Sequence, residues 1–188
     1  RNIDVLVGTR LLAYQFNLPP VSLVGILFPE EILMHGDFRS GQKTYQEIIK
    51  MMRFADSSGE GEVIIQTDQP KHYCIRSAAE HDYNSFYQKE LEYRKLLRYP
   101  PFSVMAEIVF QGDNLRTLAR EMRKFISSVK ANSNEIEVLG PALAPISRLK
   151  RKFRIQVILK TEKKKILDAV LSESLKKVKS KLSIKLYE

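Results

Sequence analysis

The sequence has only one cysteine, Cys74, among its 188 residues. A single cysteine cannot form an internal disulfide or a zinc site built from several thiolates. The sequence also lacks any apolar run near the roughly 18 residues of a membrane-spanning helix, and no charged and then apolar leader follows Arg1. We therefore expect a protein of a reducing compartment, the cytoplasm by default, with no structural metal in this chain and no membrane partner.

Common catalytic signatures are missing as well. The sequence contains no Gly-x-x-x-x-Gly-Lys-Ser/Thr phosphate loop and no His-Glu-x-x-His motif. Its three histidines, His35, His72 and His81, lie apart without metal-ligand spacing. His35 stands beside Gly36-Asp37 and could act as a ligand or base, but a solvated turn histidine is the simpler interpretation. The residues predict no complete active site of these kinds.

Positive charge is abundant and unevenly placed. The chain carries a formal net charge of +9, and residues 141–188 hold fourteen Lys or Arg against four acids, or +10. The other 140 residues hold 17 basic and 18 acidic side chains. Such asymmetry predicts a segment that binds a polyanion, because counterion release from phosphates is a main source of nucleic-acid affinity. A solubilising basic tail is the alternative.

The first part of the chain has the pattern of an α/β fragment. Apolar, β-branched runs at 3–7 and 21–27 predict two buried parallel strands, each covered on both faces. Helical spacing follows over 42–55, and an alternating strand over 60–67.

A helix is expected next, over about 78–98. It ends at Tyr99-Pro100-Pro101, because proline removes a backbone donor and disfavours helix in the preceding residue. The turn marks a domain boundary. The apolar side of this helix is expected to carry Tyr83, Phe86, Tyr87, Leu91 and Leu97.

The last 88 residues predict the order βαββαβ. Strands are expected at 103–110, 135–139, 153–160 and around 182–186. The first helix is capped by Asp113 or Asn114 and the second by Thr161, and a proline-containing basic loop separates the second and third strands. This order predicts a ferredoxin-like sandwich of two helices on an antiparallel sheet.

Several short motifs carry a family resemblance. A strand that leads into Gly8-Thr9-x-x-x-Ala13 resembles the fifth helicase motif of superfamily-two motors. With the pieces that follow, the chain resembles the bacterial primosomal replication-restart helicases (primosomal protein N-prime). Those pieces are Pro19-x-Val21-x-Leu23-Val24, Asp37-Phe38-Arg39, Gly61 to Thr67 with Pro70-x-His72-Tyr73, Tyr99-Pro100-Pro101-Phe102, and Val138-Leu139-Gly140-Pro141.

The resemblance implies a domain plan. Residues 1–75 would be the C-terminal part of the second RecA-like helicase lobe, with a parallel sheet. Residues 76–101 would be a connecting helix and linker, and 102–188 an S10-like domain that binds DNA and partners. The phosphate loop, ATP with Mg²⁺, and the zinc cysteines of this family would belong upstream of Arg1, so the chain itself needs no cofactor. Implied partners are forked or single-stranded DNA, single-stranded DNA-binding protein and primosome components.

The nucleotide-handling motifs depart from the family pattern. Where the family has Ala-Lys-Gly-x-Asp-Phe-Pro, Ala13 is followed by Tyr14-Gln15, and the sixth motif falls on 49–56. Arg53 matches its first arginine, but Asp56 stands where the second belongs, and a carboxylate there would repel phosphates. With Gly8, Thr9 and Arg53 as remnants, we expect a degenerate ATPase. An active ATP-dependent 3′-to-5′ helicase fragment is the alternative, and an RNA or ribosome binder a third.

Two groups of cations are candidate binding residues. The first group lies in a loop rich in positive charge, which can follow a phosphate backbone. Strand alternation assigns the neighbouring Phe153 to the core, in preference to stacking on a base. In the second group, Lys164 opens the last helix, and the resemblance implies that it contacts the acidic tail of single-stranded DNA-binding protein; a solvated helix end is the alternative. The candidate DNA-binding residues are Arg148, Lys150, Arg151, Lys152 and Arg154.

Overall fold

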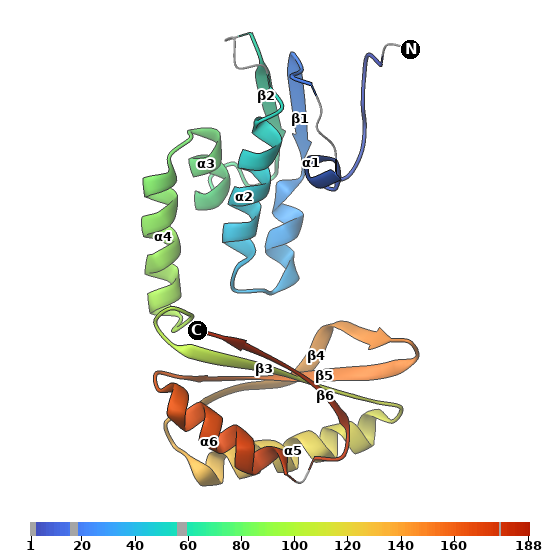
Figure 1. Ribbon diagram of the computed structural model, residues 1–188, viewed down its shortest axis with the longest axis vertical. Coiled ribbons are helices and arrows are strands. Elements are labelled where there is room, and N and C mark those ends of the chain that lie inside the picture. The colour runs from blue at the N-terminus through green and yellow to red at the C-terminus, as the bar shows by residue number, and fades with distance from the viewer. Residues whose placement is uncertain (1–2, 16–18, 56–59, 177) are drawn as a thin grey trace. The chain divides into compact units, whose positions relative to one another are not determined.

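The computed structural model divides the chain into two compact units, Arg1–Glu92 and Tyr93–Glu188. It describes residues 3–15, 19–55, 60–176 and 178–188. Helix α4 (Tyr83–Leu96) runs across the boundary between the units (Figure 1). Each unit has a hydrophobic cluster of its own.

The first unit is built on a short parallel sheet. Strand β1 (Leu23–Leu27) pairs in parallel with β2 (Glu62–Gln66), which confirms strands within the predicted ranges 21–27 and 60–67. Between them the chain forms the 3-10 helix η1 (Pro29–His35) and α2 (Ser40–Met52), and α3 (Tyr73–Ala79) follows β2. Because Tyr45 and Ile48 share one side of α2, they reach a common core with Val24 and Ile26 of β1.

Two expectations for this unit are wrong. Residues 3–7 form no strand, and Val5 and Val7 are 78% and 88% exposed. Strand β1 is buried on one face only, since Leu23 and Leu27 are more than half exposed. The reason is that β1 and β2 pair only with each other among the described strands of this unit, so no neighbouring strand lies beside residues 3–7.

The expectation of one continuous helix over about 78–98 is also wrong, because two helices occupy this range. Helix α3 ends at Ala79, His81 adopts a left-handed φ of 54°, and α4 begins at Tyr83. The Asp82 carboxylate accepts a hydrogen bond from the Ser85 N–H at 2.9 Å, which caps the new helix. Of the five side chains expected on its buried side, only Phe86 is buried.

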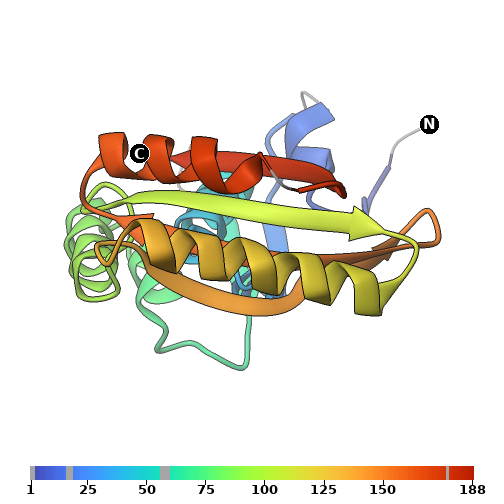
Figure 2. The same ribbon diagram turned by 90° about the horizontal axis from the view of Figure 1, so that it is seen from below.

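The second unit confirms the predicted βαββαβ order. Its elements are β3 (Val104–Gly112), α5 (Leu115–Asn132), β4 (Glu137–Leu149), β5 (Lys152–Thr161), α6 (Lys164–Leu175) and β6 (Lys181–Tyr187). The strand order is β4-β5-β3-β6 with every pair antiparallel, which is the topology of a split-βαβ sandwich. Helices α5 and α6 lie side by side on one face of this sheet (Figure 2).

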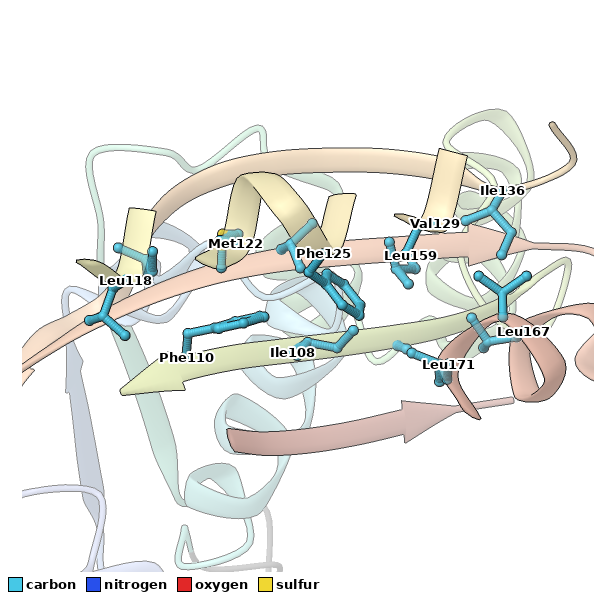
Figure 3. Close-up of a cluster of buried hydrophobic side chains, with 14 residues drawn as sticks. Ile108, Phe110, Leu118, Met122, Phe125, Val129, Ile136, Leu159, Leu167 and Leu171 are labelled. Atoms are coloured by element: carbon cyan, nitrogen blue, oxygen red, sulfur yellow. The ribbon is translucent and has the colours of Figure 1, made fainter. Parts of the chain in front are cut away.

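Strand alternation explains the core of this unit. Ala106, Ile108 and Phe110 of β3 point toward the helices, where Phe110 and Phe125 meet with ring centroids 5.6 Å apart (Figure 3). Phe153 also packs against this cluster, as its place in the alternation predicted. The helix-facing side of the sheet therefore carries the hydrophobic cluster of this unit.

The helix starts distinguish the candidate caps. The Asn114 side chain accepts a hydrogen bond from the Thr117 N–H at 3.1 Å, so Asn114 caps α5. The cap of α6 is Lys163, and the expectation of Thr161 is wrong. Thr161 is the last residue of β5, and its hydroxyl accepts the Lys163 N–H at 3.4 Å.

Strand β4 replaces the expected loop after residue 139. It continues to Leu149, with irregular register between Leu139 and Ala142 and again before Arg148. Gly140 has a φ of 110°, and its carbonyl precedes Pro141. A proline in the middle of a sheet would remove a ladder hydrogen bond, but β4 is an edge strand and tolerates it.

No helix among the residues that the structure describes is long and apolar enough to cross a membrane.

Candidate nucleic-acid interface

The five predicted cations of the basic segment lie together on the β4–β5 hairpin (Figure 1). Arg148 pairs with Phe153 and Leu149 with Lys152, which leaves Lys150 and Arg151 as the two turn residues. Their φ angles are 50° and 64°. A two-residue turn with both φ values positive matches the type I′ geometry that suits the twist of a hairpin.

The tip residues are chemically unusual for this turn. Type I′ turns prefer Asn-Gly or Asp-Gly, because most side chains are strained at positive φ. Lys150 and Arg151 adopt this conformation while their side chains stay exposed. Strained backbone of this kind costs about 1–3 kcal/mol per residue and clusters at functional sites.

The base of the hairpin is more firmly held than its tip. The Arg148 guanidinium lies over the Phe153 ring, 5.0 Å from its centroid. The Nη1 of Arg154 donates to the Ile146 carbonyl at 3.1 Å, which ties β5 to the irregular part of β4. Arg148 and Arg154 thus shape the hairpin in addition to adding charge.

Ion pairing separates the cations of this unit into two groups. Lys163, Lys164 and Lys176 pair with Glu135, Glu188 and Glu173, beside α6. Across the described part of the chain, Lys150, Arg151 and Lys152 form no ion pair with an acidic side chain. The charge of these three hairpin cations is therefore left without an acidic partner, at the place where the sequence predicted the DNA-binding residues.

Lys164 lies at the first position of α6 and is exposed. Its ammonium donates to the Glu188 carboxylate, and this hydrogen bond raises the pKa of Lys164. The site predicted for an acidic peptide thus already holds a carboxylate of the same chain.

Two further cations were missed by the sequence reasoning. Lys181 and Lys185 of β6 are exposed and lie opposite Gln111 and Glu107 of β3. They face away from the helices, because Leu182 between them packs on the core. Their alternation with Leu182, Ile184 and Leu186 was the available signal.

The residues expected to be remnants of helicase motifs lie in the first unit. Gly8 and Thr9 belong to an exposed segment before α1 (Leu12–Gln15), and the Thr9 hydroxyl accepts the Leu11 N–H at 3.4 Å. Arg53 is the exposed C-cap of α2. Asp56, the expected site of the lost arginine, lies outside the described residues.

Tyr14, which is expected to stand in place of a motif lysine, contacts α2. Its hydroxyl donates to the Glu47 carboxylate, and the Lys50 ammonium lies 3.0 Å from its ring centroid. An open hollow of about 530 Å³ lies beside it, lined by Arg10, Leu11, Tyr14, Lys43, Gln46 and Glu47. The tyrosine thus joins α1 to α2.

Asp37 organises the turn that precedes α2. Its carboxylate accepts hydrogen bonds from the Arg39 backbone N–H and guanidinium, both at 3.0 Å, and from the Lys43 ammonium. Burial opposes ionisation, but these donors outweigh it and hold the pKa of Asp37 well below its usual range.

The histidines and the cysteine form no metal-binding group in the described residues. The Nδ1 of His72 lies 3.0 Å from the Cys74 Sγ. Burial, with Glu90 nearby, raises the pKa of Cys74 to about 12, so this thiol stays protonated. The side chain of His35 lies outside the described part, and His81 is exposed.

Comparison with known proteins finds relatives that match residues of both units. Residues 95–186 match the family described as primosomal protein N C-terminal domain. Replication restart protein PriA of Bacillus subtilis is 34% identical over 184 residues, which cover 97% of this chain and 23% of that protein. The PriA proteins of Borreliella burgdorferi and Thermotoga maritima are 31% and 34% identical, over 95% and 85% of this chain and 27% and 21% of theirs. The chain thus spans about a quarter of the length of these curated relatives.

Proposed function

Since this chain belongs to the replication restart protein PriA family, we propose that its C-terminal unit binds forked or single-stranded DNA through the β4–β5 hairpin. In this proposal, Lys150 and Arg151 reach phosphates from the tip, Lys152 and Arg154 continue the contact along β5, and Arg148 supports the base. The chain acts as a binding and docking part of a replication-restart protein.

The hairpin tip is the observation that carries this proposal. A turn selected only for stability would contain Asn-Gly, yet two cations with positive φ occupy it. Lysine and arginine at an exposed tip can follow a phosphate backbone without reading bases. Retention of a strained, cationic tip is what a phosphate-contacting role predicts.

Exchange of the tip tests the proposal. Lys150→Asn with Arg151→Gly removes two charges and supplies the residues that the turn prefers. If each cation neutralises one phosphate, the slope of log K against log salt for single-stranded DNA falls by about 1.4, and affinity at about 0.2 M salt falls about tenfold. Fluorescence anisotropy with labelled single-stranded and forked DNA measures both quantities.

A matched variant controls for the loss of net charge. Lys124→Gln with Lys130→Gln removes two exposed lysines of α5, on the helix-covered face. This variant should keep most of the affinity. Equal effects of the two double variants, or no effect of the tip exchange, would refute a role for the hairpin. An oligouridine of the same length tests the RNA-binding alternative, which tighter binding of RNA than of DNA would favour.

We also propose that the start of α6 docks an acidic peptide, with the tail of single-stranded DNA-binding protein as the candidate. The Lys164–Glu188 pair supports this, since it demonstrates that the ammonium can hold a carboxylate. A peptide carboxylate would replace Glu188 there. Lys164→Ala should weaken binding of a labelled acidic tail peptide, and Glu188→Gln should strengthen it; unchanged affinity in both variants would exclude this site.

For the first unit, we propose the end of a RecA-like lobe with eroded nucleotide chemistry, and for the second an S10-like domain. The parallel β1–β2 pair and Tyr14 in place of a lysine support the former. The expected division at 1–75, 76–101 and 102–188 remains part of this proposal.

ATP hydrolysis by the protein at the length of its relatives tests the eroded motifs. If Asp56 marks erosion, DNA should stimulate little hydrolysis, and Asp56→Arg should raise the rate by restoring a positive charge near the γ-phosphate. Hydrolysis at ordinary helicase rates without the substitution would favour the alternative, an active ATP-dependent 3′-to-5′ helicase in which Arg53 suffices.

A further inference from the structure

The sheet of the second unit has one face that its own helices leave open. Side chains opposite each other on paired strands project to the same face. Gln111 of β3 lies opposite both Arg154 of β5 and Lys181 of β6, so these three side chains form a row across the sheet. Ala106, Ile108 and Phe110 face the helices, which places this row on the open face.

Beyond this row the open face is mixed in character. Ser183 lies opposite the buried Val109, and Lys185 lies opposite Glu107, whose carboxylate accepts a hydrogen bond from the Tyr187 hydroxyl at 3.1 Å. Lys181, Ser183 and Lys185 are exposed. The far end of this face is closed, because Lys160 and Met105 are each only 3% exposed.

Pairing with acids distinguishes these lysines from those beside α6. Within the described ranges, Lys181 and Lys185 take part in no ion pair, whereas Lys163, Lys164 and Lys176 each have a glutamate partner. The two lysines of the open face are thus left without an acidic partner and are available to an outside anion. Helix α5 also carries exposed cations that form no ion pair within the described ranges, so lysines on α5 can control for charge alone.

We propose that this open face binds the phosphate backbone of single-stranded DNA, which passes from the hairpin over Arg154 and Gln111 to Lys181 and Lys185. This inference rests on the proposed function, and extends the binding surface from the hairpin to the edge strand β6. Neighbouring strands lie about 4.8 Å apart, so Arg154 and Lys181 are separated by about 10 Å, and Lys181 and Lys185 by about 13 Å along β6. These spans suit a short strand of a few nucleotides.

The width of the sheet selects a single strand over a duplex. Four strands span about 14 Å between the outer backbones, before side chains are added. The major groove of B-DNA is about 12 Å wide and admits only a helix or a two-stranded ribbon. A flexible single strand can instead lie across the face, held by cations and by the Gln111 and Ser183 side chains.

Removal of the two β6 lysines tests this surface. In the full chain, Lys181→Gln with Lys185→Gln should lower the salt slope for a labelled oligothymidine by about 1.4 and its affinity about tenfold at about 0.2 M salt, if each lysine neutralises one phosphate. Affinity for a blunt duplex should change less than twofold. Both side chains are exposed, so the variant should keep its fold, and circular dichroism checks this.

The control and the tip variant separate the possible outcomes. Lys124→Gln with Lys130→Gln should keep the affinity for oligothymidine within about twofold, since the charge change is equal but lies on α5. If the tip variant loses affinity while the β6 variant matches this control, the hairpin binds DNA and the open face does not. If neither variant loses affinity, both proposals fail. An equal loss for duplex and oligothymidine would overturn the choice of a single strand, and tighter binding of oligouridine would overturn the choice of DNA.

Discussion

The Lys160 ammonium lies 3.8 Å from the centroid of the Tyr99 ring and donates a hydrogen bond to the Leu97 carbonyl at 3.0 Å. Lys160 belongs to β5 and is only 3% exposed, and burial lowers its pKa. The guanidinium of Arg98, in the same turn, lies 3.9 Å from the Glu137 carboxylate and 3.8 Å from the Glu162 carboxylate. The turn after α4 is therefore fastened to the sheet by a buried cation.

This contact predicts the effect of Lys160→Met. Methionine keeps most of the volume but leaves the Leu97 carbonyl without its donor and removes the cation from the Tyr99 ring. The free energy of unfolding should fall by about 1–2 kcal/mol. Urea denaturation followed by circular dichroism measures it, with Lys124→Met on exposed α5 as the control. Equal stability of the two variants would show that Lys160 does not fasten the turn.

The strained hairpin tip makes a separate prediction about stability. Lys150→Asn with Arg151→Gly should raise the free energy of unfolding by about 1 kcal/mol, because relief of positive-φ strain exceeds the added chain entropy of glycine. The same variant is expected to bind DNA less tightly. Thermal unfolding without DNA measures the first effect, and a drop in stability would contradict the strain assigned to the tip.

Periodicity predicted the second unit well because its elements pack on one core. The alternation at Phe153, Ile155 and Val157 and the 3/4 spacing in α5 reflect burial directly, so the order βαββαβ followed from them. The strand expected at 3–7 failed because an apolar run records a tendency to be buried and does not supply a neighbouring strand. The start of β4 was predicted, but its continuation beyond Leu139 was missed, because Gly140, Pro141 and Pro145 look like loop residues unless the strand is known to lie at an edge.

The candidate interface was predicted only in part for a similar reason. Charge density drew attention to the segment from Arg148 to Arg154, and the structure places these cations on one hairpin. Lys181 and Lys185 escaped notice because their importance depends on which face of the sheet the helices cover and on β6 pairing with β3. Both are long-range properties. The φ angles of Lys150 and Arg151 were equally inaccessible, since the residues themselves disfavour them.

Two glycines of the first unit predict opposite responses to alanine. A Cβ at Gly41 would lie 2.1 Å from the Tyr73 hydroxyl, which donates to Glu90 at 2.6 Å. Gly41→Ala should therefore displace Tyr73 and cost about 1–3 kcal/mol of stability. At Gly25 in β1 nothing lies within 4 Å, so Gly25→Ala should be neutral or slightly stabilising. Urea denaturation compares the two, and a loss at Gly25 equal to that at Gly41 would contradict the packing described.

Asp37 makes stability depend on pH in a defined direction. Its pKa is depressed in the folded chain relative to about 3.9 in the unfolded chain, so the unfolded state binds the proton more readily. The stabilisation is therefore fully present above about pH 4 and is lost as pH falls toward the folded pKa.

Asp37→Asn tests this dependence. The substitution removes the negative charge that Arg39 and Lys43 contact, and should cost about 1–2 kcal/mol at pH 7. The difference from the unsubstituted chain should shrink as pH falls below about 4, because protonation of Asp37 removes the same charge. Urea denaturation at pH 7, 4 and 2.5 measures the trend. Asp113→Asn, at an exposed position before α5, provides the control and should show little difference at any of these values. A penalty for Asp37→Asn that grows as pH falls would mean that the carboxylate does not stabilise the turn through its charge.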